Sequence, residues 1–401
     1  MMHSKMWAAT LGAVLAFGST SVLAQAPSGA QQGATDLSTL KTQLKALQQQ
    51  VNQLEHQQAQ QQEQQKVATS PALNKLAKWA ENTKIGGRLY VDATHIGGTR
   101  GDGSKVKNAG TGFDLKRFYL SVGHNFNDVW SLHFTSDFRD SRDANGKHNA
   151  LIYLKKGYVQ GRFSRLATLR VGLEGTPWVP YSEGAWGYRW VEKSLIDRAG
   201  FGTSADLGAS VLGKKGWFSY EVAVLAGGGY HHLVRPSRPD YEARIGVEPI
   251  KGLQFAVGGH YGHLGAETAN GPAALHSARR LDALVVWHRD NFRFGGEWFG
   301  AWNYSPKLIT STQADRAAGW SLWSSYDFGP ASVFARYDRV RPLRTQDPGF
   351  AENYWNVGVA YPVIKGVKVA LVYKHERRHG SQTASNNLHS NEVGLWSEIR
   401  F

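Results

Sequence analysis

The sequence contains no cysteine, and only three of its 401 residues are methionine. The absence of cysteine excludes a disulfide scaffold, a zinc-finger protein and a thiol enzyme. No apolar run reaches the roughly twenty residues that a transmembrane helix needs, so a helical membrane protein is excluded as well. A membrane β-barrel stays open, because its strands show only an alternating pattern and its overall hydropathy is low.

Acidic residues are also scarce relative to basic ones, with 32 Asp and Glu against 46 Lys and Arg and a net charge of +14. Such an excess suits nucleic acid, anionic lipid or anionic solutes as partners. The N-terminus has a positive start at Lys5, an apolar stretch over 7–17 and small residues up to Ala24. This pattern predicts a signal peptide over 1–24, cut after Ala24 or Ala26, and export argues against a nucleic-acid partner.

Residues 25–82 differ from the rest of the chain because they are rich in glutamine and carry a heptad pattern. The apolar residues are spaced 3-4-3-4-3, and they are Leu37, Leu40, Leu44, Leu47, Val51 and Leu54. This spacing predicts an α-helical coiled coil of about three heptads, which is marginal alone and makes sense if something else already joins the chains. It favours an oligomer without fixing its number. The alternative is a disordered glutamine-rich tether.

Alternation of apolar and polar residues dominates from residue 83 to the end. In the hairpin 113–138, Phe118 and Leu120 point to one face while Arg117 and Tyr119 point to the other. The same pattern predicts sixteen strands, at 84–96, 112–125, 128–138, 151–162, 166–175, 203–213, 216–227, 239–248, 252–261, 279–288, 291–302, 315–327, 331–340, 352–361, 365–376 and 389–401.

The connections between these strands alternate in length. Those after even-numbered strands are short, and those after odd-numbered strands are long and polar. This is the layout of an outer-membrane barrel, in which the apolar faces meet lipid and the polar faces line a wet lumen. The sequence therefore predicts an all-β membrane protein, with a sixteen-stranded antiparallel transmembrane β-barrel over 83–401 and a short N-terminal coiled coil.

Strand parity also places charged residues in the lumen. The basic ones are Arg88, Arg117, Arg170, Arg244, Arg293, Arg336, Lys368 and Lys374, and the acidic ones are Asp92, Asp137, Glu174, Glu221, Glu242, Glu297, Asp338 and Glu376. Eight bases against eight acids make a balanced wall, as expected if most charges pair across neighbouring strands. The net positive charge then comes largely from loops and turns.

Several segments resemble the phosphate-selective porin O/P family, namely DLKRFYLSVGHNFND, LATLRVGLEGTPW, YRWVEKSLID, ADLGASVLGKKGWFSYEVAV and VFARYDRV. The resemblance covers roughly 83–401 and implies a periplasmic coiled coil before a sixteen-stranded barrel, with barrels joined as homotrimers. It further implies that lumen arginines and lysines, here the eight bases above, draw in phosphate or polyphosphate. An arginine fork can bond two phosphate oxygens at once.

The connection 176–202 is the third long loop, and in sixteen-stranded porins the third external loop folds into the lumen. Its bases Arg189, Lys193 and Arg198 are balanced by three acids, and its aromatic residues suit a loop with its own packing. It is the candidate constriction. The alternatives are an external Ω-loop or a contact between trimer subunits.

The sequence contains no nucleophile elbow and no HExxH helix, so we expect no enzyme activity, cofactor or metal. We expect a porin of the bacterial outer membrane for passive diffusion of small hydrophilic solutes, with small anions such as phosphate preferred. Its other partners would be outer-membrane lipid and two further copies of the chain. The alternatives are a general or differently selective porin of the same fold, and an outer-membrane enzyme or surface-binding barrel.

Overall fold

The computed structural model describes residues 35–68, 71–142, 148–266 and 275–401, so the expected signal peptide over 1–24 lies outside the described residues. The chain divides into two units, residues 1–75 and 76–401. In the first unit, helix α1 (Thr35–Ala68) confirms that the heptad segment is helical. Its residues Leu40 to Leu54 of the seam are exposed, and the coiled coil stays a prediction because it needs a second chain.

Helix α2 (Pro71–Glu81) crosses the boundary between the units and precedes the first strand. None of the described helices is long and apolar enough to cross a membrane.

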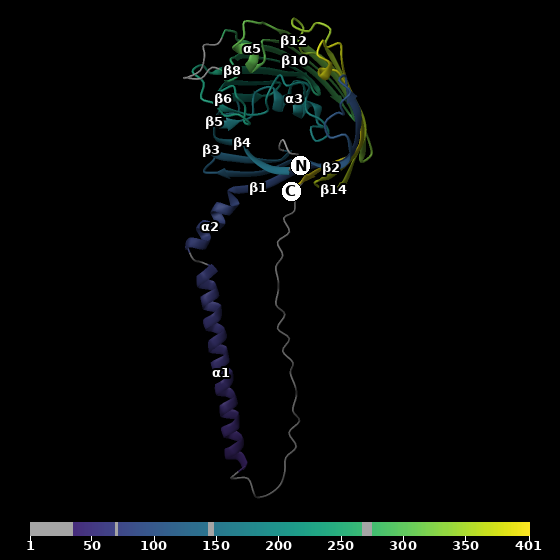
Figure 1. The fold of residues 1–401 in the computed structure, drawn as a ribbon. Coiled ribbons are helices and arrows are strands. Elements are labelled where there is room, and N and C mark those ends of the chain that lie inside the picture. The colour runs from purple at the N-terminus through teal and green to yellow at the C-terminus, as the bar shows by residue number, and fades with distance from the viewer. Residues whose placement is uncertain (1–34, 69–70, 143–147, 267–274) are drawn as a thin grey trace. The chain divides into compact units, whose positions relative to one another are not determined.

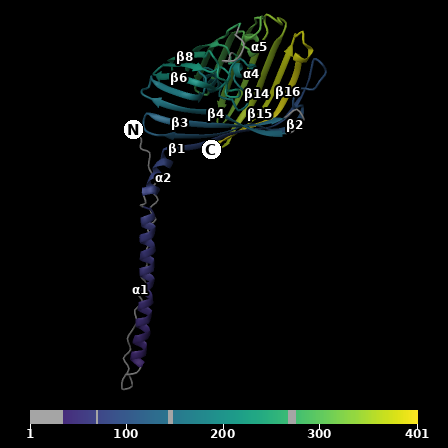
Figure 2. The same ribbon diagram turned by 60° about the vertical axis from the view of Figure 1, so that its left-hand side comes forward.

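The second unit is a closed antiparallel barrel in which each strand pairs with its neighbours in sequence and β1 pairs with β16. Figures 1 and 2 show this ring of tilted strands. All sixteen expected strands are present in the described residues: β1 Thr83–Arg100, β2 Gly110–Asn125, β3 Trp130–Arg142, β4 His148–Arg162, β5 Thr168–Glu174, β6 Asp206–Lys215, β7 Phe218–Leu225, β8 Asp240–Ile250, β9 Leu253–Gly262, β10 Ala278–Arg289, β11 Phe292–Trp302, β12 Arg316–Phe328, β13 Ala331–Arg341, β14 Ala351–Ile364, β15 Val367–His379 and β16 Leu388–Arg400.

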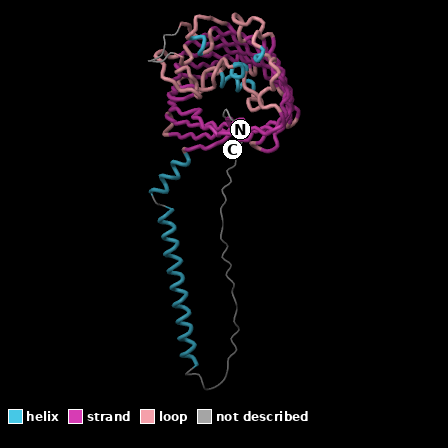
Figure 3. The backbone as a smooth tube through the Cα atoms, viewed as in Figure 1, coloured by secondary structure: helices cyan, strands magenta, loops and turns pink. Residues whose placement is uncertain are grey.

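The two ends of the barrel differ, as the connection lengths predict. Tight turns follow the even-numbered strands, and glycines with positive φ such as Gly216, Gly252 and Gly366 occupy three of them. Glycine suits these positions because it enters the left-handed region without a steric penalty. The long connections and their short helices gather at the other end and inside the barrel (Figure 3). We call the two ends the short-turn end and the long-loop end.

Alternation along each strand sends the two faces to opposite sides of the barrel wall. On β13, Phe334, Arg336 and Asp338 are buried inside, while Val333 and Tyr337 are exposed on the outer face. The same pattern holds on β7, where Ala223 is buried and Val222 and Val224 are exposed. The hairpin pattern is therefore that of a barrel with an apolar outside and a polar inside.

Two bulges break this alternation and add lysines to the inner face. The register of β1 and β2 shifts between Tyr90 and Val91, and that of β3 and β4 shifts between Thr135 and Ser136. A bulge places two residues of one strand opposite one residue of its partner. Lys116 thereby reaches Asp92 at 3.1 Å, and Lys155 reaches the inner-face Tyr119.

Candidate functional site

The long connection between β5 and β6 folds into the barrel and carries the short helices α3 (Val179–Trp186) and α4 (Leu195–Ala199). Figure 1 shows α3 within the ring of strands. Trp186 packs edge-on against Trp323 and Phe334 on the inner faces of β12 and β13. The expected constriction loop therefore lies inside the barrel, and the alternative of an external Ω-loop is wrong. We call residues 176–202 the inner loop.

Carboxylates of the barrel wall hold the inner loop by hydrogen bonds and ion pairs. Glu297 accepts from Trp178 Nε1 at 2.8 Å and from the backbone N–H of Leu195 at 3.3 Å. Arg198 of the loop is buried and donates to Asp338 at 2.9 Å, and it also pairs with Glu352. Buried polar groups with several partners fix geometry strongly, because losing one partner leaves the other unsatisfied.

Basic residues of the wall hold the same loop through its carbonyl oxygens. Arg244 donates to Pro177 O at 3.1 Å, Lys374 donates to Val191 O at 2.9 Å, and Arg280 donates to Phe201 O at 2.7 Å. Arg336 bonds the carbonyl of Lys193, and Arg293 bonds two carbonyls at the end of α3. The loop thus lies against strands β8, β10, β11, β13 and β15.

Of the eight expected wall bases, five are held by contacts inside the barrel and three are more open. Arg244, Arg293, Arg336 and Lys374 contact the inner loop, and Arg117 is buried beside Asp137 at 2.8 Å. The remaining three are more open. The Arg88 side chain is 44% exposed and lies 3.7 Å from Glu398, Arg170 bonds Gln160 at 2.9 Å, and Lys368 is exposed near the short-turn end.

A cavity of about 460 Å³ lies between the inner loop and the wall formed by β1–β4. Tyr90, Tyr119 and Thr135 contribute polar edges to it. Its basic lining residues are Arg88, Lys155, Lys156, Arg189 and Arg400, against a single acidic one, Glu183. Arg189 pairs with Glu183, so the two lysines are the cations in this cavity without a carboxylate in ion-pair range among the described residues.

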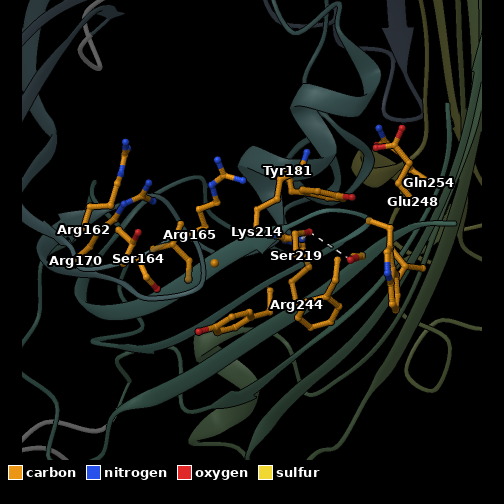
Figure 4. A pocket seen from close by; sticks show the side chains of 18 of the residues that line it. Arg162, Ser164, Arg165, Arg170, Tyr181, Lys214, Ser219, Arg244, Glu248 and Gln254 are labelled. Atoms are coloured by element: carbon orange, nitrogen blue, oxygen red, sulfur yellow. Dashed lines mark hydrogen bonds between the residues drawn. The ribbon is translucent and has the colours of Figure 1, made fainter. Parts of the chain in front are cut away.

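A second cavity of about 460 Å³ lies beneath α3 toward the short-turn end (Figure 4). Figure 4 shows Arg162, Arg165 and Arg170 on one side of it and Glu248 and Gln254 on the other. The lining also includes Lys214 and Arg244, and Glu248 is its one carboxylate. In the described part of the chain, no carboxylate lies in ion-pair range of Arg162, Arg165 or Lys214.

This second cavity continues into a larger one of about 1040 Å³, with which it shares Tyr181, Glu248 and Gln254. Arg289 and Arg293 line the larger cavity, so basic side chains continue along the short-turn end.

The charges of the wall that was expected to be balanced are therefore distributed unevenly in space. Glu242, Glu297 and Asp338 are buried where the inner loop is held, and their oxygens already accept bonds from the loop or from neighbouring arginines. These carboxylates therefore lie on the side of the barrel against which the inner loop packs, where they accept bonds. In the open cavities, Lys155, Lys156, Arg162, Arg165 and Lys214 have no carboxylate in ion-pair range among the described residues.

Electrostatics of the inner loop itself centre on Glu192. Burial would raise the pKa of this carboxyl group, but the nearby cations Lys374, Arg198 and Arg336 outweigh burial and lower its pKa to about 2. Its oxygen also accepts from Tyr354 at 3.2 Å. Glu192 is therefore ionised at neutral pH and ties the loop to β14 and β15.

Sequence reasoning did not find several inward cations. Lys116 and Lys155 depend on the bulges, which alternation alone does not reveal. Arg280 shares the face of Asp282 opposite the exposed Leu281, so parity could have found it. Among the described residues, no group of three or more His, Asp or Glu could hold a metal ion.

Comparison by sequence gives no match to a protein-family model or to a curated protein. Solved structures are similar in fold. An anion-selective porin from Comamonas acidovorans has a TM-score of 0.56 at 9% identity, over 80% of this chain and 99% of that one. OprB of Pseudomonas putida has a TM-score of 0.55 at 9% identity, over 80% and 95%.

A loop-deletion mutant of OmpT, an outer membrane protein of Vibrio cholerae, has a TM-score of 0.54 at 12% identity, over 80% of this chain and 99% of that chain. At such identities the likeness shows the fold. The chain has the barrel fold of outer-membrane porins.

Proposed function

We propose that this protein is an outer-membrane porin through which small hydrophilic solutes diffuse passively, with a preference for anions such as phosphate or polyphosphate. The observation that carries the proposal is the uneven lumen. The inner loop lies against β8–β15, while the cavities beside and beneath it are lined by Lys155, Lys156, Arg162, Arg165 and Lys214, none of which has a carboxylate in ion-pair range in the described part of the chain.

The outer face of the barrel supports placement in a membrane. Large apolar side chains such as Val222, Ile245, Leu322 and Leu371 are exposed there. Exposure of so large an apolar surface to water is unfavourable. In lipid the surface is covered by acyl chains, and a closed barrel satisfies all backbone hydrogen bonds internally. With the porin folds above, this supports the bacterial outer membrane. The proposal also places residues 25–82 in the periplasm.

Transport in this proposal follows from fixed charge and needs no cofactor or energy source. Clustered positive charge raises the local concentration of anions in a narrow polar space. Arg170 lines the cavity and uses one of its donors to bond Gln160 at 2.9 Å, so part of its guanidinium group is free to contact a solute. In this proposal it binds a phosphate strongly enough to admit it and weakly enough to release it. The same reasoning applies to Arg162 and Arg165 at the short-turn end.

A homotrimer is part of the proposal. The exposed seam of α1 needs partner helices, and the fold neighbours include OmpT in a trimer form. A trimer would also supply the prior association that so short a coiled coil requires.

A general or differently selective porin of the same fold is the second candidate. It is favoured by the eight acids that strand parity places in the lumen beside eight bases, and by Glu183 and Glu248 in the two basic cavities. These two carboxylates could offset part of the positive field. They decide how strong the anion preference is rather than whether a channel exists.

The reversal potential of single channels in a salt gradient tests the proposal. The purified full-length protein is inserted in planar bilayers, and current is measured with and without added phosphate. Anion-selective reversal with block by low phosphate is the expected result. Unselective current that ignores phosphate would leave the general porin, and silent but folded barrels would refute the channel and favour an enzyme or surface-binding barrel.

A further inference from the structure

Two bulges in the barrel wall each turn one lysine into the lumen. The β1–β2 ladder skips Lys116, and the β3–β4 ladder skips Lys155. A bulge leaves one residue outside the ladder and re-aims its side chain. The same backbone feature therefore places two amines inside the barrel, and the surroundings of these two amines differ.

Lys116 is an ion-paired lysine. Its nitrogen lies 3.1 Å from a carboxylate oxygen of Asp92 and 3.9 Å from one of Asp114, and its side chain is 39% exposed. An amine in such ion pairs is an ammonium ion, which has no lone pair with which to react. Lys116 therefore serves as the internal reference for Lys155.

Lys155 is buried and lacks a carboxylate partner. Among the described residues, no carboxylate lies in ion-pair range of its nitrogen. The carboxylates of Asp137 and Glu183 are instead bonded to Arg117 and Arg189. A lysine amine that is shielded from water or lies beside another cation is the kind that acts as a nucleophile.

Two tyrosines flank the amine of Lys155. Its nitrogen lies 4.5 Å from the ring centroid of Tyr119 and 5.2 Å from that of Tyr230. Lys155 Nζ also donates to the Tyr119 hydroxyl oxygen at 3.1 Å, and this is the one hydrogen bond of that hydroxyl in the described part of the chain. The Tyr119 O–H is thus left to donate to a further group, as a proton relay between an amine and a carbonyl oxygen requires.

The rest of the cavity beside β1–β4 attracts anions. Arg88 and Arg400 line this cavity and share one carboxylate, Glu398, at 3.7 Å and 2.6 Å. Their side chains are 44% and 48% exposed, so both guanidinium groups can contact a solute. Lys156 lines the cavity as well, and no carboxylate of the described residues lies in its ion-pair range. Positive charge therefore exceeds negative charge around the cavity.

We propose that Lys155 reacts reversibly with the carbonyl group of a small anionic aldehyde that enters this cavity, while Arg88, Arg400 and Lys156 attract the anionic group. The cavity volume of about 460 Å³ lies within the roughly 300–1,000 Å³ of small-molecule sites. This inference concerns covalent binding and does not require that the barrel conduct.

The reaction balances without an oxidant or a reductant. The lone pair of Lys155 Nζ attacks the carbonyl carbon, and the carbonyl oxygen receives one amine proton by way of the Tyr119 hydroxyl, which gives a carbinolamine. The hydroxyl group of the carbinolamine then leaves as water with the second amine proton, and a C=N bond forms. Addition of water reverses both steps.

The test uses the purified full-length protein in neutral detergent at neutral pH, with para-formylbenzoate and its uncharged methyl ester as probes. Sodium cyanoborohydride reduces the C=N bond and fixes the adduct, and peptide mass spectrometry measures the labelling rate of each lysine. The variants are Lys155→Arg, Lys156→Gln and Tyr119→Phe. Heat-modifiable migration in gels confirms that each variant is folded.

In the folded wild type, para-formylbenzoate is expected to label Lys155 at least about tenfold faster than Lys116, although Lys116 is the more exposed of the two. The methyl ester should label Lys155 more slowly than the anion does, and Lys156→Gln should narrow that difference. Tyr119→Phe should slow the labelling of Lys155 by at least about tenfold, because it removes the proton relay. Lys155→Arg should abolish labelling at this position without increasing it at Lys116.

Equal labelling rates of Lys155 and Lys116 in the folded protein, as expected for the chain unfolded in urea, would refute the inference. Faster labelling by the ester would refute the anionic class of the ligand, and labelling of Lys156 in place of Lys155 would overturn the assignment of the nucleophile. Single-channel current on the unlabelled protein separates this inference from the proposed function. A conducting barrel with an unreactive Lys155 refutes only the covalent site, and a reactive but silent barrel refutes only the porin.

Discussion

Replacing Lys155 and Lys156 together with glutamine should weaken the anion preference of the channel. Both side chains line the cavity between the inner loop and β1–β4, and neither has a carboxylate partner among the described residues. The substitution removes two positive charges while keeping polar side chains of similar length. Lys155 donates to Tyr119 at 3.1 Å, and a glutamine amide can replace that bond.

The size of the effect follows from the size of the cavity. A volume of about 460 Å³ corresponds to a sphere about 5 Å in radius, so an ion at its centre lies about 6 Å from each ammonium group. In water-like surroundings each lysine then contributes about 0.7 kcal/mol. Screening at 0.1 M salt leaves roughly half of this, or about 0.7 kcal/mol for both.

An anion loses this attraction in the variant and a cation loses an equal repulsion, so the two ions differ by about 1.4 kcal/mol, or roughly tenfold in selectivity. The assay is the reversal potential in a potassium chloride gradient at low salt. Lys116→Gln is the control, because Lys116 already pairs with Asp92 at 3.1 Å and does not line the cavity. Equal reversal potentials for wild type and the double variant would refute the reasoning.

Three further predictions concern the inner loop. Glu297→Ala removes the acceptor of Trp178 and Leu195, so single-channel current should become larger and noisier; unchanged current would show that the loop is held elsewhere. The pKa of Glu192 in the folded protein lies below its value in the unfolded chain, so the ion pairs of Glu192 hold the inner loop fully above pH of about 4.5 and are lost as the pH falls toward about 2. The noise of the single-channel current should therefore rise only in that pH range. Glu192→Gln should abolish this pH dependence. Gly187→Ala should lower the temperature of heat-modified migration by costing about 1 kcal/mol or more, because Gly187 has φ 80° and its Cβ would meet Arg293. Gly184→Ala, inside α3 and with no atom within 4 Å of the added Cβ, should not lower that temperature, because alanine favours a helix over glycine.

The strands and their order could be predicted because both are local properties. Alternation gives the faces of each strand, and turn residues such as the glycines of the short turns mark where strands end. Connection length then tells which end of the barrel a turn belongs to. The boundaries differ from the structure by only a few residues, as for β13, expected at 331–340 and observed at Ala331–Arg341.

The bulges could not be predicted because one inserted residue leaves no mark in composition. On β4, strict alternation from Gln160 places Lys156 inside and Lys155 outside. The bulge opposite Thr135 and Ser136 turns Lys155 inward as well. A change of one residue thus adds a cation to the cavity, which no periodic pattern along the strand contains.

Strand parity predicts on which side of the barrel wall a charged side chain lies, but it does not predict which groups that side chain contacts. Arg170 and Arg244 are indistinguishable by sequence pattern and both line the cavity beneath α3, yet Arg170 bonds Gln160 of the wall whereas Arg244 donates to Pro177 O of the inner loop at 3.1 Å. The difference is set by the path of the inner loop, which brings together residues more than sixty positions apart. Only the folded chain shows which cations the loop occupies.

The position of the inner loop therefore determines the electrostatics of the lumen. The loop leaves β5 and is held by Glu297, Asp338 and Lys374 on the opposite side, so acids and bases of that side satisfy one another and the loop backbone. Cations on β4 and β6, such as Lys156 and Lys214, have no carboxylate in ion-pair range among the described residues, and in the proposed porin they stay available to solutes. In the proposed porin, a wall that carries many acids can in this way still present a positive pathway, because selectivity depends on the charges that packing leaves unpaired.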